Sequence, residues 1–288
     1  MGAPNADMRE HWDKGVGQDW VTQQGRLDAL LEPLGQLALA ALGEVKGRSL
    51  LDIGCGCGAS TLAAASLVGP EGHVTGVDVS QPMLDRANER VVELGLTARV
   101  ELRLADAQQA DLGERSFDGA MSRLGVMFFD DASLAFGNIR TALRVGASLA
   151  FVCWRDPGLN PWFSKTSAAA ARHIEIPPPP PAGTPGPFGL ADDRLIEETL
   201  TSAGFGSIEA CAVDEPMMAG TRLEDAVALA LSIGPVARAV SEVKPTPSRL
   251  DALADALGEA LEPYAGDDGV RVPGGVWVVS ARRLCDAG

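Results

Sequence analysis

The chain has 288 residues, of which 46% are hydrophobic and 22% are charged, and its formal net charge at pH 7 is −15. This length and composition predict a folded α/β domain with added segments and exclude a disordered chain. The acidity, without a Lys/Arg cluster, argues against a nucleic acid partner. No apolar run suits a membrane span or a signal peptide. The five cysteines, an odd number without framework spacing, favour reduced thiols and a cytoplasmic protein.

The first regular pattern lies at residues 26–42, where leucines and alanines at helical spacing predict a helix that ends at Gly43. Residues 49–53 are a short apolar run followed by a cluster of glycines. An alanine-rich helix is expected at 59–67 and a second apolar run at 74–79. A strand, a glycine turn, a helix and a strand in this order predict a βαβ unit of parallel sheet.

The alternation of strands and helices continues to residue 154 and predicts a doubly wound α/β sheet. Ser80 is a candidate N-cap for the next helix, which should stop at Gly95. The remaining elements expected in this part are strands at 100–104, 117–121 and 147–154 and a helix at 131–143.

The rest of the chain is less regular. A Pro/Gly-rich stretch at 177–187 excludes a helix interior or a central strand, so it is either a stiff connector or part of a lid. A helix is expected at 192–203, and strands at 207–213 and 276–281 enclose a long stretch of helical pattern. We therefore divide the chain into an N-terminal helical lid (1–45), a core (46–154), a Pro-rich cap or linker (155–190), a continuation of the core (191–219), a helical cap insertion (220–266) and a final core strand (267–288).

Three carboxylates stand at the ends of three successive predicted strands: Asp52, Asp78 and Asp106. Asp52 directly precedes Gly54-x-Gly56, a turn that lets a ligand approach the backbone. Its charge repels a pyrophosphate but accepts an ammonium group, whereas Asp78 can accept ribose hydroxyls and Asp106 an adenine amino group. The pattern predicts binding of S-adenosyl-L-methionine (SAM). Because the glycines also satisfy the dinucleotide fingerprint, an NAD-dependent oxidoreductase is the alternative.

Segments 50–58, 77–83, 105–107, 117–129 and 146–154 resemble the motifs of the class I SAM-dependent methyltransferases, and they are most similar to the small-molecule branch that includes enzymes of ubiquinone and menaquinone biosynthesis. The resemblance implies a Rossmann-like, doubly wound, seven-stranded sheet whose last strand is antiparallel. By match to the family motifs, it also implies cofactor contacts from Asp52, Gly54, Gly56, Asp78, Val79, Met83, Asp106, Ala107, Ser122 and Arg123.

The expected activity is methyl transfer from SAM to a small hydrophobic or aromatic molecule, with release of S-adenosylhomocysteine. Since the donor is already activated, positioning supplies much of the catalysis, and neither His11 nor His173 is assigned a catalytic role. A SAM-binding protein without methyl transfer is a second alternative, because every motif serves the cofactor. No metal site is expected, since Cys55 and Cys57 lack nearby partner ligands. Aromatic candidates for the acceptor pocket are Trp12, Trp20, Phe128, Phe129, Trp154, Trp162 and Phe188, with Trp20 and Phe128 as first choices.

Overall fold

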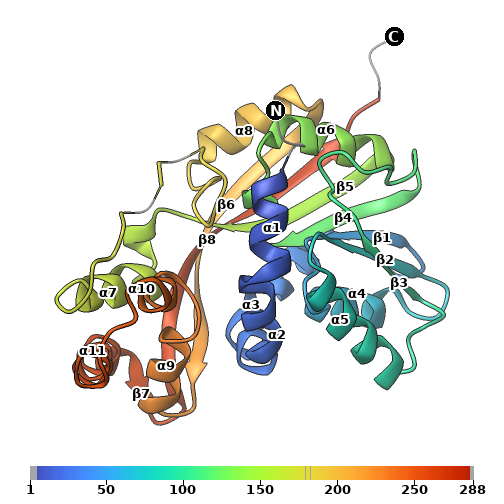
Figure 1. The fold of residues 1–288 in the computed structure, drawn as a ribbon. Helices are drawn as coiled ribbons and strands as arrows, with labels where there is room; N and C mark the ends of the chain where they lie inside the picture. Colours follow the sequence, from blue (N-terminus) through green and yellow to red (C-terminus); the bar gives the residue numbers. More distant parts are fainter. Residues whose placement is uncertain (1–4, 179, 182, 286–288) are drawn as a thin grey trace.

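A computed structural model describes residues 5–178, 180–181 and 183–285 and shows helices around one mixed sheet (Figure 1). The strands are β1 (Ser49–Ile53), β2 (His73–Asp78), β3 (Val100–Leu104), β4 (Phe117–Arg123), β5 (Leu143–Trp154), β6 (Phe205–Gly220), β7 (Ala265–Gly266) and β8 (Gly269–Arg283).

The sheet has the strand order β3-β2-β1-β4-β5-β8-β6, and β7 pairs with β8 outside this order. Strands β1 to β5 are parallel to one another, whereas β8 is antiparallel to both β5 and β6. The predicted Rossmann-like sheet with an antiparallel last strand is therefore confirmed. The two-residue strand β7 raises the strand number from the expected seven to eight.

Helices cover both faces of the sheet, with α6 and α8 above the strands and α3, α4 and α5 below them in Figure 1. The predicted leucine stripe of α3 is buried at Leu27, Leu30, Leu31 and Leu34, which explains why this segment is helical even with Pro33 inside it. The bounds of these helices are α3 (Gln24–Leu42), α4 (Ala59–Val68), α5 (Gln81–Glu93), α6 (Ala132–Ala142) and α8 (Asp193–Ser202), and the short helix η1 (Val126–Phe128) follows β4.

Two N-terminal helices, α1 (Ala6–Lys14) and α2 (Val16–Thr22), were not predicted individually, because this segment lacks an apolar period. Tertiary contacts hold them. Helix α2 packs on α5, and the carboxylate of Asp13 accepts a hydrogen bond from the N–H of Gln81, 3.0 Å away, at the start of α5. Ser80 occupies the N-cap position of α5, but its side chain makes no capping hydrogen bond. The N-terminal segment supplies that cap instead.

Four helices gather at the far end of the long β6–β8 ribbon (Figure 1, lower left). Helix α11 packs on α7 and α9, and α10 packs on α7. In the part of the chain that the structure describes, no single helix is long and apolar enough to cross a membrane, although α9 and α10, bent by 60°, pass that test together. The helices are α7 (Pro161–Ala170), α9 (Leu223–Ala230), α10 (Pro235–Val243) and α11 (Pro247–Leu261), with short helices η2 (Pro157–Leu159) and η3 (Glu262–Tyr264).

The predicted ends of the last two strands are wrong. Strands β6 and β8 extend well beyond 207–213 and 276–281, through segments that contain glycine and proline. Pro216 stands opposite Pro273 in this extension. Proline is tolerated there because β6 is an edge strand and β8 extends past the end of β5 at Pro273, so each backbone has one side that needs no ladder hydrogen bonds.

Candidate functional site

The turn between β1 and α4 requires glycine at two positions. Gly54 has φ of +68° and Gly56 has φ of +54°, both in the left-handed region. A Cβ atom on Gly54 would lie 2.9 Å from the Cα of Gly125, and one on Gly56 would lie 2.8 Å from the Cε of Met83. The turn is therefore packed between the loop after β4 and helix α5, in a conformation that side chains would not permit.

Asp52 is the penultimate residue of β1 and is completely buried. Its Oδ2 accepts hydrogen bonds from the hydroxyls of Ser60 (2.7 Å) and Thr61 (2.6 Å). Burial raises the pKa of Asp52, and the hydrogen bonds from Thr61 and Ser60 and the charge of Arg123 only partly oppose this. Its Oδ1 has no hydrogen-bond partner among the described residues. A buried carboxylate oxygen without a donor is rare and indicates that a ligand or an ordered water supplies one.

Asp78 ends the neighbouring strand β2 and holds the glycine turn. Its Oδ2 accepts the N–H of Gly56 (2.8 Å) and its Oδ1 accepts the N–H of Ser80 (2.9 Å). Burial raises the pKa of Asp78, and these backbone donors oppose the shift. Because a carboxylate oxygen offers two lone pairs, both oxygens can accept a further donor.

Asp106 follows β3 and is brought to the same edge by the hydrogen bond from the N–H of Ala105 to the carbonyl oxygen of Asp78 (2.9 Å). Its Oδ1 accepts the N–H of Gln108 (3.0 Å) and the carboxamide Nδ2 of Asn5 (3.2 Å). The three carboxylates predicted from the sequence therefore lie at or just beyond the carboxyl ends of three adjacent strands. Sequence reasoning missed Asn5, because no local pattern connects it to Asp106.

Ser122 and Arg123 at the end of β4 differ in their contacts. The hydroxyl of Ser122 donates to the carbonyl oxygen of Ile53 (2.7 Å) and accepts the N–H of Gly125 (3.2 Å), so it ties β4 to β1. Burial lowers the pKa of Arg123, while the negative charges of Asp28 and Asp52 oppose that shift. Asp28 itself forms an ion pair with Arg90 on α5 (2.8 Å). Arg123 thus places a half-buried positive charge near Asp52.

The other predicted cofactor residues have simpler surroundings. Val79 is half-buried directly after Asp78. Met83 is buried with its methyl group against Gly56. Ala107 is buried, and its carbonyl oxygen accepts a hydrogen bond from Asn138 of α6 (2.9 Å). Val79 and Met83 therefore lie beside the glycine turn at this edge of the sheet.

The aromatic candidates form two clusters. In the first, the ring of Trp12 meets the edges or faces of Trp20 and Phe128, with centroids 5.6 and 5.1 Å apart. In the second, Phe163 lies between Trp154 (5.4 Å) and Phe188 (5.1 Å). Phe163 was missed, although its position next to Trp162 on an aromatic-rich helix was a usable signal.

Phe129 and Trp162 lie outside these two clusters. Phe129 stacks edge-on with Phe136 of α6, with centroids 6.2 Å apart. Trp162 is buried within α7, near Gly234 before α10. Their contacts are those of core side chains.

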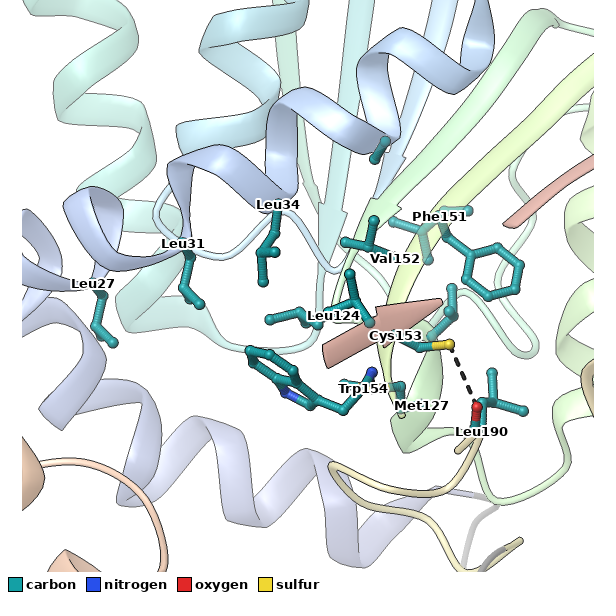
Figure 2. Packing of buried hydrophobic residues seen from close by; sticks show 14 of the residues in the cluster. Leu27, Leu31, Leu34, Leu124, Met127, Phe151, Val152, Cys153, Trp154 and Leu190 are labelled. Carbon is teal, nitrogen blue, oxygen red and sulfur yellow. Dashed lines mark hydrogen bonds between the residues drawn. The ribbon is translucent and has the colours of Figure 1, made fainter. Parts of the chain in front are cut away.

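Figure 2 shows that the end of β5 faces two ways. The indole of Trp154 extends toward Leu31 of α3 and lies beside Leu124, whereas Cys153 points to the other side and donates to the carbonyl oxygen of Leu190 (3.5 Å). This follows from the alternation of side chains along a strand. Trp154 therefore belongs to the face of the sheet that α3 covers.

Cys55 and Cys57 in the glycine turn are buried and unpaired. Burial is the main cause that raises the pKa of Cys57 to about 11, so this thiol is protonated at neutral pH. Within the described ranges, no group of three His, Cys, Asp or Glu side chains could hold a metal ion.

Comparison with known proteins gives consistent matches. A family described as a methyltransferase domain matches residues 50–146. Aklanonic acid methyltransferase DauC from Streptomyces is 35% identical over 119 residues, 41% of this chain and 54% of that protein. O-methyltransferase rstn1 from Aspergillus nomiae is 28% identical over 201 residues, 69% of this chain and 80% of that protein. The match to DauC thus spans only about half of that protein's length.

A solved structure has the same fold. Phosphoethanolamine N-methyltransferase 2 from Haemonchus contortus, in complex with SAM, aligns with a TM-score of 0.59 and 21% identity, and the alignment covers 99% of this chain and 61% of that one. At this identity the likeness establishes the fold, while the family match and the curated relatives establish the sequence relationship. Residues 50–146 therefore carry a methyltransferase domain, and the matched relatives and the fold support a class I SAM-dependent methyltransferase, whose cofactor is SAM.

Proposed function

We propose that this protein transfers the methyl group of SAM to a small aromatic or otherwise hydrophobic acceptor. The observation that carries the proposal is the unpaired Oδ1 of the buried Asp52, which lies beside a glycine turn whose left-handed backbone side chains rarely adopt. Such an oxygen suits the ammonium group of the methionine tail, directly or through water. The half-buried charge of Arg123 suits the carboxylate of the same tail.

The other two carboxylates fit the nucleoside part of SAM. Asp78 has acceptor capacity left on both oxygens, which suits the two ribose hydroxyls. Asp106 suits the adenine amino group. Gly54, Gly56, Val79 and Met83 would shape the walls around these groups, and Ala107 would border the base. The order of amino, sugar and base contacts would then follow the order of strands β1, β2 and β3.

When bound, SAM supplies a methyl group on a positively charged sulfur, so the chain needs no nucleophile of its own. The protein's own residues hold the acceptor in line and exclude water, and such positioning is worth roughly 7–11 kcal/mol in favourable cases. We propose that residues 1–45 act as the lid and that segments 155–190 and 220–266 form the cap. The aromatic clusters around Trp12 and Phe163 would line the acceptor side.

The chemistry of the acceptor follows from these walls. The rings of Trp20, Phe128, Trp154 and Phe188 offer flat apolar surfaces, which favour an aromatic molecule. The similarity to an O-methyltransferase makes a phenolic hydroxyl the first choice. The acidic chain with unpaired cysteines supports a cytoplasmic enzyme that acts on a free small molecule rather than on nucleic acid.

The proposal is tested by binding and turnover. Calorimetry should detect binding of S-adenosylhomocysteine and no binding of NADH. Incubation with SAM and a panel of polycyclic phenols, hydroxyquinones and aromatic carboxylic acids should yield S-adenosylhomocysteine and a methylated product by mass spectrometry. Cofactor binding without turnover of any acceptor would favour a SAM-binding protein that transfers no methyl group. Binding of NADH alone would overturn the proposal.

A further inference from the structure

Asn5 is an unusual residue at the start of α1. It is only 4% exposed, and its backbone is left-handed with φ of 58°, a conformation that asparagine tolerates better than most residues. An asparagine at a helix start normally accepts a hydrogen bond from a backbone N–H of the first turn. The carboxamide of Asn5 makes no such cap, so helix capping does not explain it.

The contacts of Asn5 direct its side chain to the base end of the proposed site. Its backbone N–H donates to the Oδ2 of Asp130 (2.5 Å), and this hydrogen bond anchors Asn5 to the loop after η1. Its Nδ2 donates to the Oδ1 of Asp106 (3.2 Å), and Gln109 donates to the Oδ2 of Asp106 (3.3 Å). The backbone anchor therefore leaves the carboxamide beside the carboxylate assigned to the adenine amino group.

The Oδ1 of Asn5, like the Oδ1 of Asp52 and the hydroxyl oxygen of Ser80, is a buried acceptor at this edge without a partner in the described residues. Such an oxygen is costly unless a ligand provides a donor. The 6-amino group of adenine has two hydrogens, whereas Asp106 needs only one of them. A base with an oxygen at position 6 would instead turn a lone pair toward two acceptors.

We infer that Asn5 is a base-specificity residue, which accepts the second hydrogen of the adenine amino group and selects a 6-aminopurine. The inference rests on the proposed function, because it requires adenine beside Asp106. Asn5 would also connect the cofactor site with the aromatic cluster around Trp12, since both residues belong to the N-terminal segment. Recognition of the base would thereby fasten the start of α1 over the cofactor.

The test compares S-adenosylhomocysteine with S-inosylhomocysteine, which carries oxygen in place of the amino group, by calorimetry on the full chain. The variant Asn5→Gly keeps the left-handed backbone and removes the carboxamide. Affinity for the adenosyl compound should fall about tenfold, while affinity for the inosyl compound should change less than about twofold. The second variant, Asp130→Ala, removes the backbone anchor of Asn5 and should likewise weaken the adenosyl compound more than the inosyl compound.

Equal weakening of both compounds in Asn5→Gly, or of neither, would overturn the role of Asn5. A wild-type protein that fails to bind S-adenosylhomocysteine would instead overturn the proposed function and this inference together. A thermal melt of each variant shows whether it is folded, and the ratio of the two affinities is independent of the folded fraction.

Discussion

Two regions of the molecule differ in the residue types that form them. One is the edge formed by β1, β2 and β3, and the other lies between the N-terminal helices, β5 and α7. The first is made of carboxylates, glycines and backbone N–H groups, and each carboxylate stands at the end of its own strand. The second is made of aromatic rings that come from six separate positions between Trp12 and Phe188. The first region specifies donors and acceptors atom by atom, whereas the second specifies mainly shape.

This difference indicates which kind of ligand each region can bind. A polar site with fixed partners suits a constant ligand, because each mismatch leaves a buried group unpaired. A wall of rings suits a variable ligand, because apolar contact is not directional. We therefore expect substitutions at the strand ends to weaken cofactor binding, and substitutions in the aromatic clusters to change acceptor affinity alone.

The largest effect is expected for Asp78→Ala. Loss of two ribose hydrogen bonds, each worth about 1.5 kcal/mol, should weaken S-adenosylhomocysteine binding about 100-fold, as measured by calorimetry. Asp118→Ala is the matched control. Asp118 lies on core strand β4 near its start, where it accepts the N–H of Ser49 (2.9 Å) and pairs with Arg144, so its loss should lower stability and leave affinity unchanged. Unchanged affinity in Asp78→Ala would refute the ribose role.

The next effect is expected for Gly54→Ala. Its left-handed φ and the backbone of Gly125 at 2.9 Å should together cost about 2–3 kcal/mol, so thermal melts should show a lower Tm and cofactor affinity should fall. Gly137→Ala is the control, because Gly137 is in helix α6 with open space around its Cα, and alanine there should raise the Tm slightly. Similar Tm changes in both variants would contradict the packed turn.

Two smaller effects of opposite sign are expected for Asp52→Asn: higher stability of the cofactor-free protein and lower affinity for S-adenosylhomocysteine. Burial raises the pKa of Asp52, so the folded protein binds this proton more tightly than the unfolded chain, and stability falls as pH rises between the ordinary and the raised pKa. The amide removes this loss, so the cofactor-free variant should be more stable at neutral pH and its Tm should depend less on pH. Its affinity for S-adenosylhomocysteine should fall about tenfold.

Melting curves from about pH 4 to about pH 8 and calorimetry measure both quantities. Asp78 shares the direction of the pKa shift and is present in both proteins, so the difference between wild type and variant isolates Asp52. A variant that is less stable at neutral pH, or that binds as tightly as wild type, would show that Asp52 serves the fold rather than the ligand.

The smallest effect on the cofactor is expected for Trp12→Leu. Loss of the ring contacts with Trp20 and Phe128, each worth about 0.5–1.5 kcal/mol, should raise the KM for an aromatic acceptor about tenfold. Affinity for S-adenosylhomocysteine should stay within about twofold of wild type. Trp277→Phe, in the antiparallel strand β8, is the control and should change neither constant. An equal loss of affinity for the acceptor and for S-adenosylhomocysteine in Trp12→Leu would contradict the assignment of the two ligands to separate regions.

The carboxylate edge of β1, β2 and β3 could be predicted from the sequence because the patterns that indicate it are local. Asp52 and Gly54 lie in one short segment, and the alternation of strands and helices places Asp78 and Asp106 at neighbouring strand ends. The same alternation predicted the parallel sheet, since buried strands and amphipathic helices have different periods. The residues therefore determined the order of the core elements and the position of the glycine turn.

Other features depended on the tertiary structure, because their partners are distant in the chain. Helices α1 and α2 lack an apolar period and are held by contacts such as that of Asp13 with Gln81. The ends of β6 and β8 pass through prolines that only an edge position tolerates. The contact between Asn5 and Asp106 joins residues 101 positions apart. No local rule relates such residues, so only the packed chain decides which of them meet.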